Sequence, residues 1–357
     1  MRMPPLRIPG DGGAFDVAIE CSPNTADIAI IGVMKGQLSV IRNSIVAHIA
    51  APPDFTAGLA IDSHFVVHVG EEYLTIWDHQ PGVSATRIAH QCDVGDDVSG
   101  RMRWIARHHL QILFRDALQS WDCKSGKLLE QVDVPAEFNL VAVHSPPGKD
   151  ASIVTLNDSG RELSVWSASS LALRYRLPID ENACLIGATG EVAILYKKSS
   201  PMLSAVFLPS GDVLCEFQAD SQSGVAAFCS DGQHVVTSLC DRGLHSGLSV
   251  TNVFSGIQRH LVPSHPFRPR VIPSRFHRAF ATITNDKRHP VDRTSLWGVD
   301  GREVLRTAGH TASGAQAFSS TGAFISVSNE FGAEHCVSGD PAGTVVVSDF
   351  STELAYT

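Results

Sequence analysis

The sequence lacks the local patterns on which enzyme and membrane assignments usually rest. Its N-terminus has no apolar stretch of signal-peptide length, and no later run approaches the roughly 18 residues that a membrane span needs. It contains no G-x-S-x-G, H-E-x-x-H, Walker or C-x-x-C-H motif. We therefore expect a cytoplasmic protein without a membrane span, and no motif predicts a catalytic residue, a cofactor or a metal ligand.

Cysteine pairs of the zinc-binding or redox type are also missing. The eight cysteines are spread along the chain and form no C-x-x-C pair. Most of them lie inside apolar segments, where a free cysteine packs as a small hydrophobic residue. This pattern favours reduced, buried thiols over disulfides.

Helical periodicity is absent too. No stretch sustains apolar residues at i, i+3, i+4 and i+7, and no glycine-rich phosphate loop is present, which argues against a parallel α/β fold. With 28 Lys+Arg against 37 Asp+Glu, the formal net charge is -9, so we expect no whole-surface affinity for nucleic acid or an anionic membrane. The 43% of apolar residues, 29 Gly and 19 Pro suit many short strands joined by turns.

What the chain does contain is an internal repeat. One apolar, β-branched segment occurs eight times, at Asp27–Ile31, His64–Val67, Leu110–Phe114, Ser152–Leu156, Glu191–Leu195, His234–Thr237, Ala279–Ile283 and Ala323–Val327. From Asp27 to Ala323 is 296 residues over seven intervals. The mean period of about 42 residues lies in the range of a four-stranded propeller blade.

A second strand-like segment follows each copy, and several of these segments end in tryptophan. The series is Leu38–Ile41, Leu74–Asp78, Leu118–Asp122 (one residue out of phase), Leu163–Trp166, Leu203–Val206, Leu248–Thr251, Ser295–Trp297 and Val345–Asp349. Glycine stands five residues after the tryptophan position in four copies, at Gly82, Gly126, Gly211 and Gly256, and Gly301 is one residue closer. Because glycine permits a positive φ, this spacing predicts a hairpin turn between the third and fourth strands.

Two copies of the repeat end in a full Trp-Asp pair, Trp77-Asp78 and Trp121-Asp122, and two more keep only the tryptophan, Trp166 and Trp297. In this degenerate form the chain resembles the Trp-Asp-repeat (WD-repeat) propellers. The resemblance spans the whole chain. We predict an all-β, single-domain, eight-bladed β-propeller over residues 1–357, with seven blades as the alternative. Its four-stranded blades would start near Phe15, Thr56, Val98, Asn139, Asn182, Ser223, Pro269 and Gly314.

Blade eight has little material for a fourth strand of its own. Residues 5–9, with Leu6 to Ile8 at their centre, can supply it beside Thr344 to Asp349 and close the ring, which would remove the two exposed edges of an open array. Residues 353–357 are the alternative source. First to third strands should be buried on both faces, because each blade packs between two neighbours. The tryptophans of the repeat should then lie between blades.

Histidines and acids offer weak alternatives for chemistry. Eight of the 16 histidines, His64 and His277 among them, lie in or beside strand segments, where packed or solvent-edge imidazoles are expected. Glu334, His335, Cys336 and Asp340, with His310, could hold a metal, but their spacing matches no standard zinc motif. The Gly309-His310 pair resembles the Gly-His pair that precedes the first strand in the Trp-Asp family, which implies a structural role for His310.

One sector combines long loops with positive charge. Antiparallel order puts the second-to-third and fourth-to-first connections on one face, and there the connections Asp241–Gly247, Asn285–Arg293 and Asn329–Gly343 are long. Between Arg259 and Arg293, eight Lys/Arg against Asp286 and Asp292 leave a local charge of +6. Residues able to converge there are Arg268, Arg270, Lys287, Arg288, His289 and Arg293. A solvated face is the simpler interpretation, and a docking patch for an acidic protein segment is the functional one.

The resemblance implies a non-catalytic protein-interaction scaffold, or a subunit of a multiprotein complex, that docks a protein partner on this face of blades six to eight. A propeller enzyme, or an anionic-ligand-binding protein with a site at the channel mouth, is the alternative. Nucleic acid is an unfavoured partner in an acidic chain, and the sequence leaves the oligomeric state open.

Overall fold

The computed structural model consists of strands and the turns that join them. It describes residues 6–8, 17–21, 28–32, 37–42, 45–50, 57–78, 85–94, 101–134, 140–144, 152–157, 161–179, 183–197, 202–218, 226–241, 244–261, 270–274, 277–284, 293–308, 316–318, 323–329 and 343–349. These residues form strands β1 to β32, paired into eight four-stranded antiparallel sheets. No helix in this part of the chain is long and apolar enough to cross a membrane.

The sheets fall into two compact units, and the first spans Met1–Val134 and His310–Thr352. Its strands are β1 (Leu6–Ile8), β2 (Val17–Cys21), β3 (Ile28–Gly32), β4 (Gln37–Arg42), β5 (Ile45–Ala50), β6 (Gly58–Ile61), β7 (Phe65–Val69), β8 (Tyr73–Asp78), β9 (Thr86–Ala89), β10 (Met102–Ala106), β11 (His109–Leu113), β12 (Ala117–Asp122), β13 (Lys127–Asp133), β30 (Gln316–Phe318), β31 (Ala323–Asn329) and β32 (Gly343–Asp349). The first strands of neighbouring sheets, β30, β2, β6 and β10, contact one another in that order.

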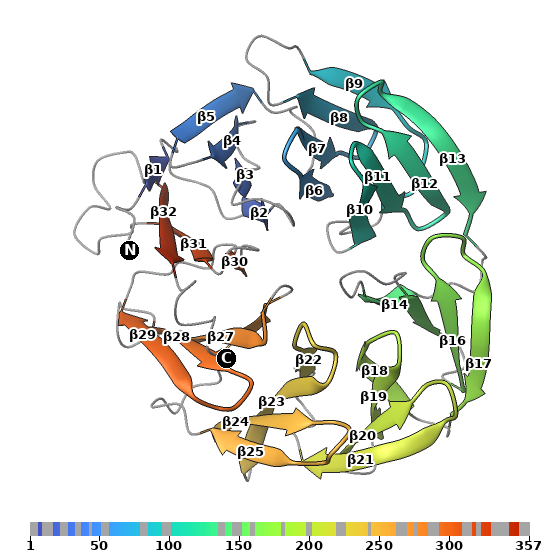
Figure 1. Ribbon diagram of the computed structural model, residues 1–357, viewed down its shortest axis with the longest axis vertical. Coiled ribbons are helices and arrows are strands. Elements are labelled where there is room, and N and C mark those ends of the chain that lie inside the picture. Colours follow the sequence, from blue (N-terminus) through green and yellow to red (C-terminus); the bar gives the residue numbers. More distant parts are fainter. Residues whose placement is uncertain are drawn as a thin grey trace. The chain divides into compact units, whose positions relative to one another are not determined.

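The second unit spans Pro135–Gly309 and Glu353–Thr357. Its strands are β14 (Leu140–His144), β15 (Ser152–Leu156), β16 (Glu162–Ser167), β17 (Leu173–Pro178), β18 (Ala183–Ala188), β19 (Val192–Lys197), β20 (Met202–Phe207), β21 (Asp212–Gln218), β22 (Ala226–Phe228), β23 (His234–Asp241), β24 (Leu244–Asn252), β25 (Gln258–Leu261), β26 (Arg270–Pro273), β27 (Ala279–Thr284), β28 (Arg293–Gly298) and β29 (Glu303–Ala308). Here β14, β18, β22 and β26 follow one another in contact, and the fourth strands β17, β21, β25 and β29 border the unit on its outer side (Figure 1).

Burial follows the order of strands in a sheet. All five residues of β7 and most of β8 and β12 are buried, whereas β9, β13 and β17 are largely exposed. Second and third strands therefore bury both faces, as expected for sheets packed between two neighbours. The same expectation for first strands holds in β6 but is wrong for most of β10 and β18, which are only half-buried or exposed. A first strand is an edge strand, paired on one side only.

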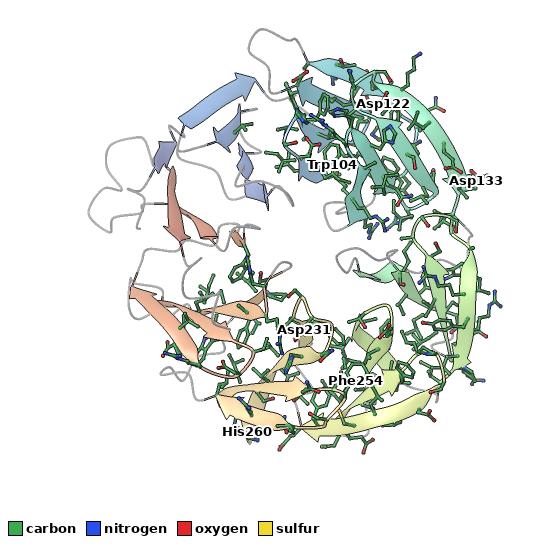
Figure 2. All side chains as sticks on the ribbon, viewed as in Figure 1. Trp104, Asp122, Asp133, Asp231, Phe254 and His260 are labelled. Carbon is green, nitrogen blue, oxygen red and sulfur yellow. The ribbon has the colours of Figure 1, made fainter. Side chains whose placement is uncertain are left out.

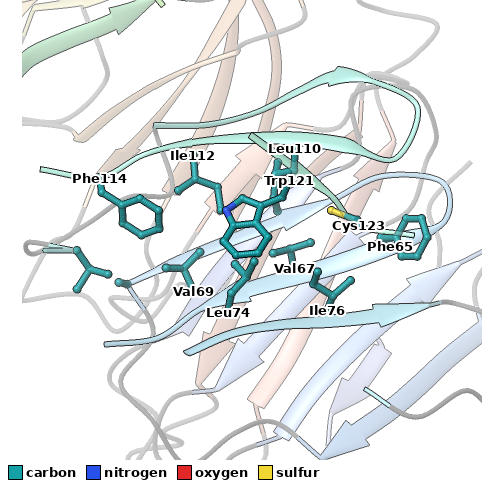
Figure 3. Close-up of a cluster of buried hydrophobic side chains, with 13 residues drawn as sticks. Phe65, Val67, Val69, Leu74, Ile76, Leu110, Ile112, Phe114, Trp121 and Cys123 are labelled. Atoms are coloured by element: carbon teal, nitrogen blue, oxygen red, sulfur yellow. The ribbon is translucent and has the colours of Figure 1, made fainter. Parts of the chain in front are cut away.

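The core lies between consecutive sheets. In the first unit, Val67, Val69 and Leu74 of one sheet pack against Leu110, Ile112 and Trp121 of the next (Figure 3). Burial of this apolar surface holds the sheets together, because the hydrogen bonds that pair the strands run only within each sheet. The second unit repeats the arrangement, with clusters on both faces of the β18–β21 sheet.

The repeat tryptophans occupy one structural position. Trp77, Trp121, Trp166 and Trp297 pair with the second residue of the preceding strand, namely Val66, Leu110, Ile153 and Phe280. All four are buried, with 4% to 6% of their surface exposed. Trp121, which looks one residue out of phase in the sequence, is therefore in phase in the structure. Two of the four indoles donate to a threonine of the paired strand, Trp166 to Thr155 Oγ1 (3.0 Å) and Trp297 to Thr282 Oγ1 (2.9 Å).

The glycine after the tryptophan has two roles. Gly126 and Gly211 have φ angles of +66° and +80°, as predicted for this turn. A β-carbon at Gly126 would also lie 3.2 Å from Thr86 Cγ2, on the fourth strand of the preceding sheet. The turn thus lies against its neighbour. Leu171 occupies the same position after Trp166 and takes a φ of +51° without being glycine.

The two ends of the described chain share a sheet. β1 pairs antiparallel with β32, with Leu6 opposite Val345, Arg7 opposite Thr344 and Ile8 opposite Gly343. The N-terminal strand thus takes the fourth place in the sheet of β30, β31 and β32. Without it, β32 would be an edge strand.

Candidate functional site

Two of the six predicted docking residues begin strands of the same sheet. Arg270 is the first residue of β26 and lies opposite Ile283, while Arg293 is the first residue of β28 and lies opposite Thr284. Since β26 and β28 flank β27, both arginines stand at the end of the sheet where β27 finishes. Arg268, Lys287, Arg288 and His289 lie outside the described residues, as does the acid and histidine cluster at Glu334, His335, Cys336, Asp340 and His310.

One of the expected long loops is wrong. The connection Asp241–Gly247 is largely a hairpin, because β23 and β24 continue pairing up to Asp241 and Leu244. Cys240 lies opposite His245 while Leu239 lies opposite Gly247, so Ser246 forms a bulge. Continued pairing satisfies backbone groups that a loop would leave to solvent, and the bulge absorbs the unmatched residue.

A cleft between two turns was not anticipated from the sequence. It has a volume of about 480 Å³ and is lined by residues 62–64, between β6 and β7, and by residues 104–107, at the end of β10. We call it the turn cleft. Its walls therefore come from consecutive sheets of the first unit. Trp104, labelled in Figure 2, lies on β10 and is half-buried. Ile105 is 43% exposed.

Asp62 shapes the first wall. Its Oδ1 accepts hydrogen bonds from the backbone N–H groups of His64 and Phe65, both at 2.6 Å, and only 5% of the residue is exposed. This is an Asx turn, in which a short carboxylate side chain caps the backbone just after it. The cap fixes the position of His64 at the rim of the cleft.

His64 and Arg107 join the two walls. Arg107 donates from Nε (3.2 Å) and from Nη2 (2.7 Å) to His64 Nε2. A guanidinium has no acceptor, so this imidazole nitrogen must carry a lone pair and the neutral ring must hold its proton on Nδ1. Among the described residues, no carboxylate lies within ion-pair distance of Arg107.

His108 completes the second turn. It has a φ of +70°, a strained conformation for a residue with a side chain, and its ring meets those of His64 and Phe65 edge-on at 5.1 and 5.2 Å. Burial, and then the proximity of His64 and Arg107, hold the pKa of His108 below its ordinary value. His108 Nδ1 and Trp104 Nε1 are buried and have no hydrogen-bond partner among the described residues.

The second unit contains a counterpart of this arrangement. Asp231 caps the backbone N–H groups of Gln233 and His234 as Asp62 caps its own turn, and its Oδ2 also accepts from His234 Nδ1 at 2.7 Å. Arg278, from the corresponding turn of the next sheet, donates to the same oxygen at 3.2 Å. The arginine is neutralised here, whereas Arg107 is not.

Replacing Asp231 with Asn should destabilise the protein by about 2 kcal/mol at pH 7, since charge-assisted hydrogen bonds are lost. Burial raises the pKa of Asp231, but the bonds from His234 and the two backbone amides outweigh it and leave that pKa well below its usual range. A depressed folded-state pKa stabilises the fold above the unfolded value of about 4 and loses that effect as pH falls towards the folded value. Melting temperatures of wild type and Asp231→Asn should therefore differ most above pH 5 and converge below about pH 4. The exposed Asp300→Asn is the control, and a gap independent of pH would contradict the assignment.

One feature of the sequence points to the residues that line the turn cleft. Of five tryptophans, Trp104 is the one away from the repeat position, and it closely precedes the Arg107-His108-His109 run. From the sequence, His64 was interpreted as a packed or solvent-edge imidazole. That interpretation is incomplete, because His64 also accepts hydrogen bonds from Arg107.

Metal and thiol chemistry receive no support from the described residues. In them, no group of three or more His, Cys, Asp or Glu side chains could hold a metal ion. Five cysteines in the described part are free thiols. Burial raises the pKa of Cys92 to about 11 and also raises those of Cys123 and Cys229, so these thiols stay protonated at neutral pH.

Consecutive four-stranded antiparallel sheets, without an α-helix in the described residues, are typical of the β-propeller class. Solved structures bear this out. The WD40 domain of SCAP from fission yeast is similar to this chain with a TM-score of 0.58 and 11% identity, over 98% of this chain and 99% of that one. Dihydro-heme d1 dehydrogenase NirN in complex with DHE has a TM-score of 0.57 and 16% identity, over 84% of this chain and 67% of that one. No known family and no curated protein matches the sequence, so the likeness shows the β-propeller fold alone.

Proposed function

We propose that the eight sheets are the blades of one eight-bladed propeller whose ring is closed by β1. Each sheet has four strands, and seven of them take all four from one continuous stretch of chain. The remaining sheet draws its fourth strand from the opposite terminus, which is the arrangement that closes circular repeat folds. The likeness to a WD40 domain over almost the full length of both chains supports this proposal.

We further propose that the protein is a non-catalytic scaffold that binds a protein partner. The observation that carries this proposal is the full-length likeness to the SCAP WD40 domain, since propellers of this type serve mainly as binding platforms. Large apolar side chains that a partner would bury are also exposed. Those on the second unit are Leu173, Val213, Phe254 and Ile257.

The docking face that we propose is the end of the β26–β29 sheet that bears Arg270 and Arg293, with Arg268, Lys287, Arg288 and His289 on the segments that adjoin these two residues in the chain. The shared end of Arg270 and Arg293 supports this choice. In an acidic chain, a local excess of +6 would attract an acidic protein segment.

Reversal of two charges tests the docking face. The partner is first captured from native extract on wild type, identified by mass spectrometry and purified. Lys287→Glu/Arg288→Glu should then slow its association and flatten the salt dependence, because steering by long-range charge is screened by salt. Lys124→Glu/Lys127→Glu changes the net charge equally at an exposed turn of the first unit and should bind like wild type. Equal binding by all three proteins at low salt would exclude this face as an electrostatic dock.

The likeness to NirN favours a second candidate, a propeller enzyme or a protein that binds a small ligand. The two functions differ in what purified protein retains. A scaffold should be isolated with a protein partner and no tightly bound small molecule, which native mass spectrometry of the untagged protein measures. A stoichiometric small ligand with no protein partner would favour the second candidate.

A further inference from the structure

The turn cleft combines features that an anion site needs and a purely structural contact does not. The guanidinium of Arg107 is exposed, has no carboxylate partner among the described residues, and is held by two hydrogen bonds to His64. The bonds to His64 use Nε–H and one Nη2–H, so the two hydrogens of Nη1 and the second of Nη2 are left. These can donate side by side to the two oxygens of one carboxylate.

In the second unit, the corresponding turns are joined by an ion pair, which is a purely structural contact. There Arg278 is paired with the carboxylate of Asp231 at 3.2 Å. In the first unit, Asp62 is equivalent to Asp231 but bonds to backbone amides, and Arg107 instead binds a neutral imidazole. The positive charge of Arg107 is thus positioned without a direct ion pair among the described residues, in a cavity large enough for a small ligand.

The other residues that line the cleft indicate the chemistry of the rest of the ligand. Trp104 and the exposed Ile105 offer aromatic and aliphatic surface beside the charge. Asp62 also lines the cleft and would repel a dianion such as phosphate more strongly than a monoanion. One guanidinium next to an apolar wall fits a single carboxylate carried by an apolar or aromatic group.

We propose that the turn cleft binds a monocarboxylate with an apolar or aromatic body, with Arg107 holding the carboxylate and Trp104 and Ile105 contacting the body. This site is independent of the proposed docking function, since it lies in the first unit and shares no residue with the docking face. The carboxylate could come from a small molecule or from an acidic side chain of a peptide, and both present the same group to Arg107.

The test uses phenylacetate and its neutral analogue phenylacetamide on the full chain. Tryptophan-selective ¹⁵N labelling gives signals from five indoles, and Trp104→Phe identifies the signal of Trp104. Phenylacetate should shift that signal and bind with a dissociation constant of about 1 mM or below by calorimetry, as expected for a ligand of this size. Phenylacetamide should bind at least about tenfold more weakly, because it cannot accept two charge-assisted bonds.

Matched variants separate the site from general charge effects. Arg107→Gln should weaken phenylacetate binding by about tenfold or more, whereas Arg115→Gln, which removes a charge from the exposed Arg115 of the same sheet, should not. The peptides acetyl-Ala-Glu-Phe-amide and acetyl-Ala-Gln-Phe-amide identify the source: a preference for the Glu peptide over phenylacetate indicates a protein side chain, and the reverse indicates a small molecule. If neither carboxylate shifts the Trp104 signal, or if Arg107→Gln binds like wild type, the proposal is wrong.

Discussion

Replacing Trp297 with Ala should destabilise the protein by about 3 to 5 kcal/mol, the largest loss that we expect from any single substitution in the described residues. Trp297 is 6% exposed and stacks on Phe280, at a ring distance of 6.4 Å and an angle of 9°. It packs in one cluster with Val236 and Leu248 of the preceding sheet. Truncation therefore opens a cavity between two sheets, where neither sheet can collapse without breaking its own hydrogen bonds.

Urea unfolding measures this loss as a lower midpoint at unchanged slope. Trp104→Ala is the matched control, since Trp104 is half-buried and away from the repeat position, and it should cost clearly less. Thr282→Val leaves the buried Trp297 Nε1–H without its acceptor and should cost about 1 to 2 kcal/mol. Adding Trp297→Phe to Thr282→Val should then cost less than the sum of the two single changes, because the donor has gone too. Additive losses would contradict the hydrogen bond.

The repeat could be predicted from the sequence because burial restricts the residue types that each strand can hold. Second and third strands are buried on both faces, so they read as short apolar runs. The indole at the end of the third strand is buried in each copy that keeps it, and those of Trp121 and Trp297 pack between two sheets. Gly126 and Gly211 were visible for a different reason, since their positive φ angles exclude most other residues. Leu171 shows the limit of that rule, because it takes the same backbone conformation and gives no sign of it in the sequence.

Contacts between turns could not be predicted, because they join residues about one repeat apart that share no local pattern. His64 and Arg107 are 43 positions apart, and Asp231 and Arg278 are 47. An aspartate caps the preceding turn in both cases, yet Arg278 meets that aspartate and Arg107 meets the imidazole of His64, and no local pattern in the sequence distinguishes the two outcomes. The β23–β24 hairpin was missed for a similar reason: Asp241 and Gly247 look like loop residues, while cross-strand pairing continues to Asp241 and Leu244 and a bulge at Ser246 restores the register.

Removing residues 1 to 10 should lower the stability by about 3 kcal/mol or more, a large share of the margin of a typical protein. The deletion removes β1, and with it three residue pairs to β32 that no other strand replaces in the described sheet. It also turns β32 into an open edge, whose unpaired N–H and C=O groups favour association with another chain. If β1 closes the propeller as proposed, the loss also frees the two ends of the array from each other.

Two deletions control for loss of length alone. A chain that begins at Pro5 keeps Leu6 to Ile8, so its melting temperature should match that of wild type. Removal of residues 353–357 should also have little effect, because the fourth place in that sheet is already taken by β1. Melting temperature and size-exclusion chromatography together read out both consequences: only the chain lacking β1 should melt earlier and elute partly as larger species. If the chain without residues 353–357 is the one that melts earlier, the closing strand comes from the C-terminus. If neither the chain without residues 1–10 nor the chain without residues 353–357 melts earlier, the stability of the ring does not depend on a sheet shared by the two ends.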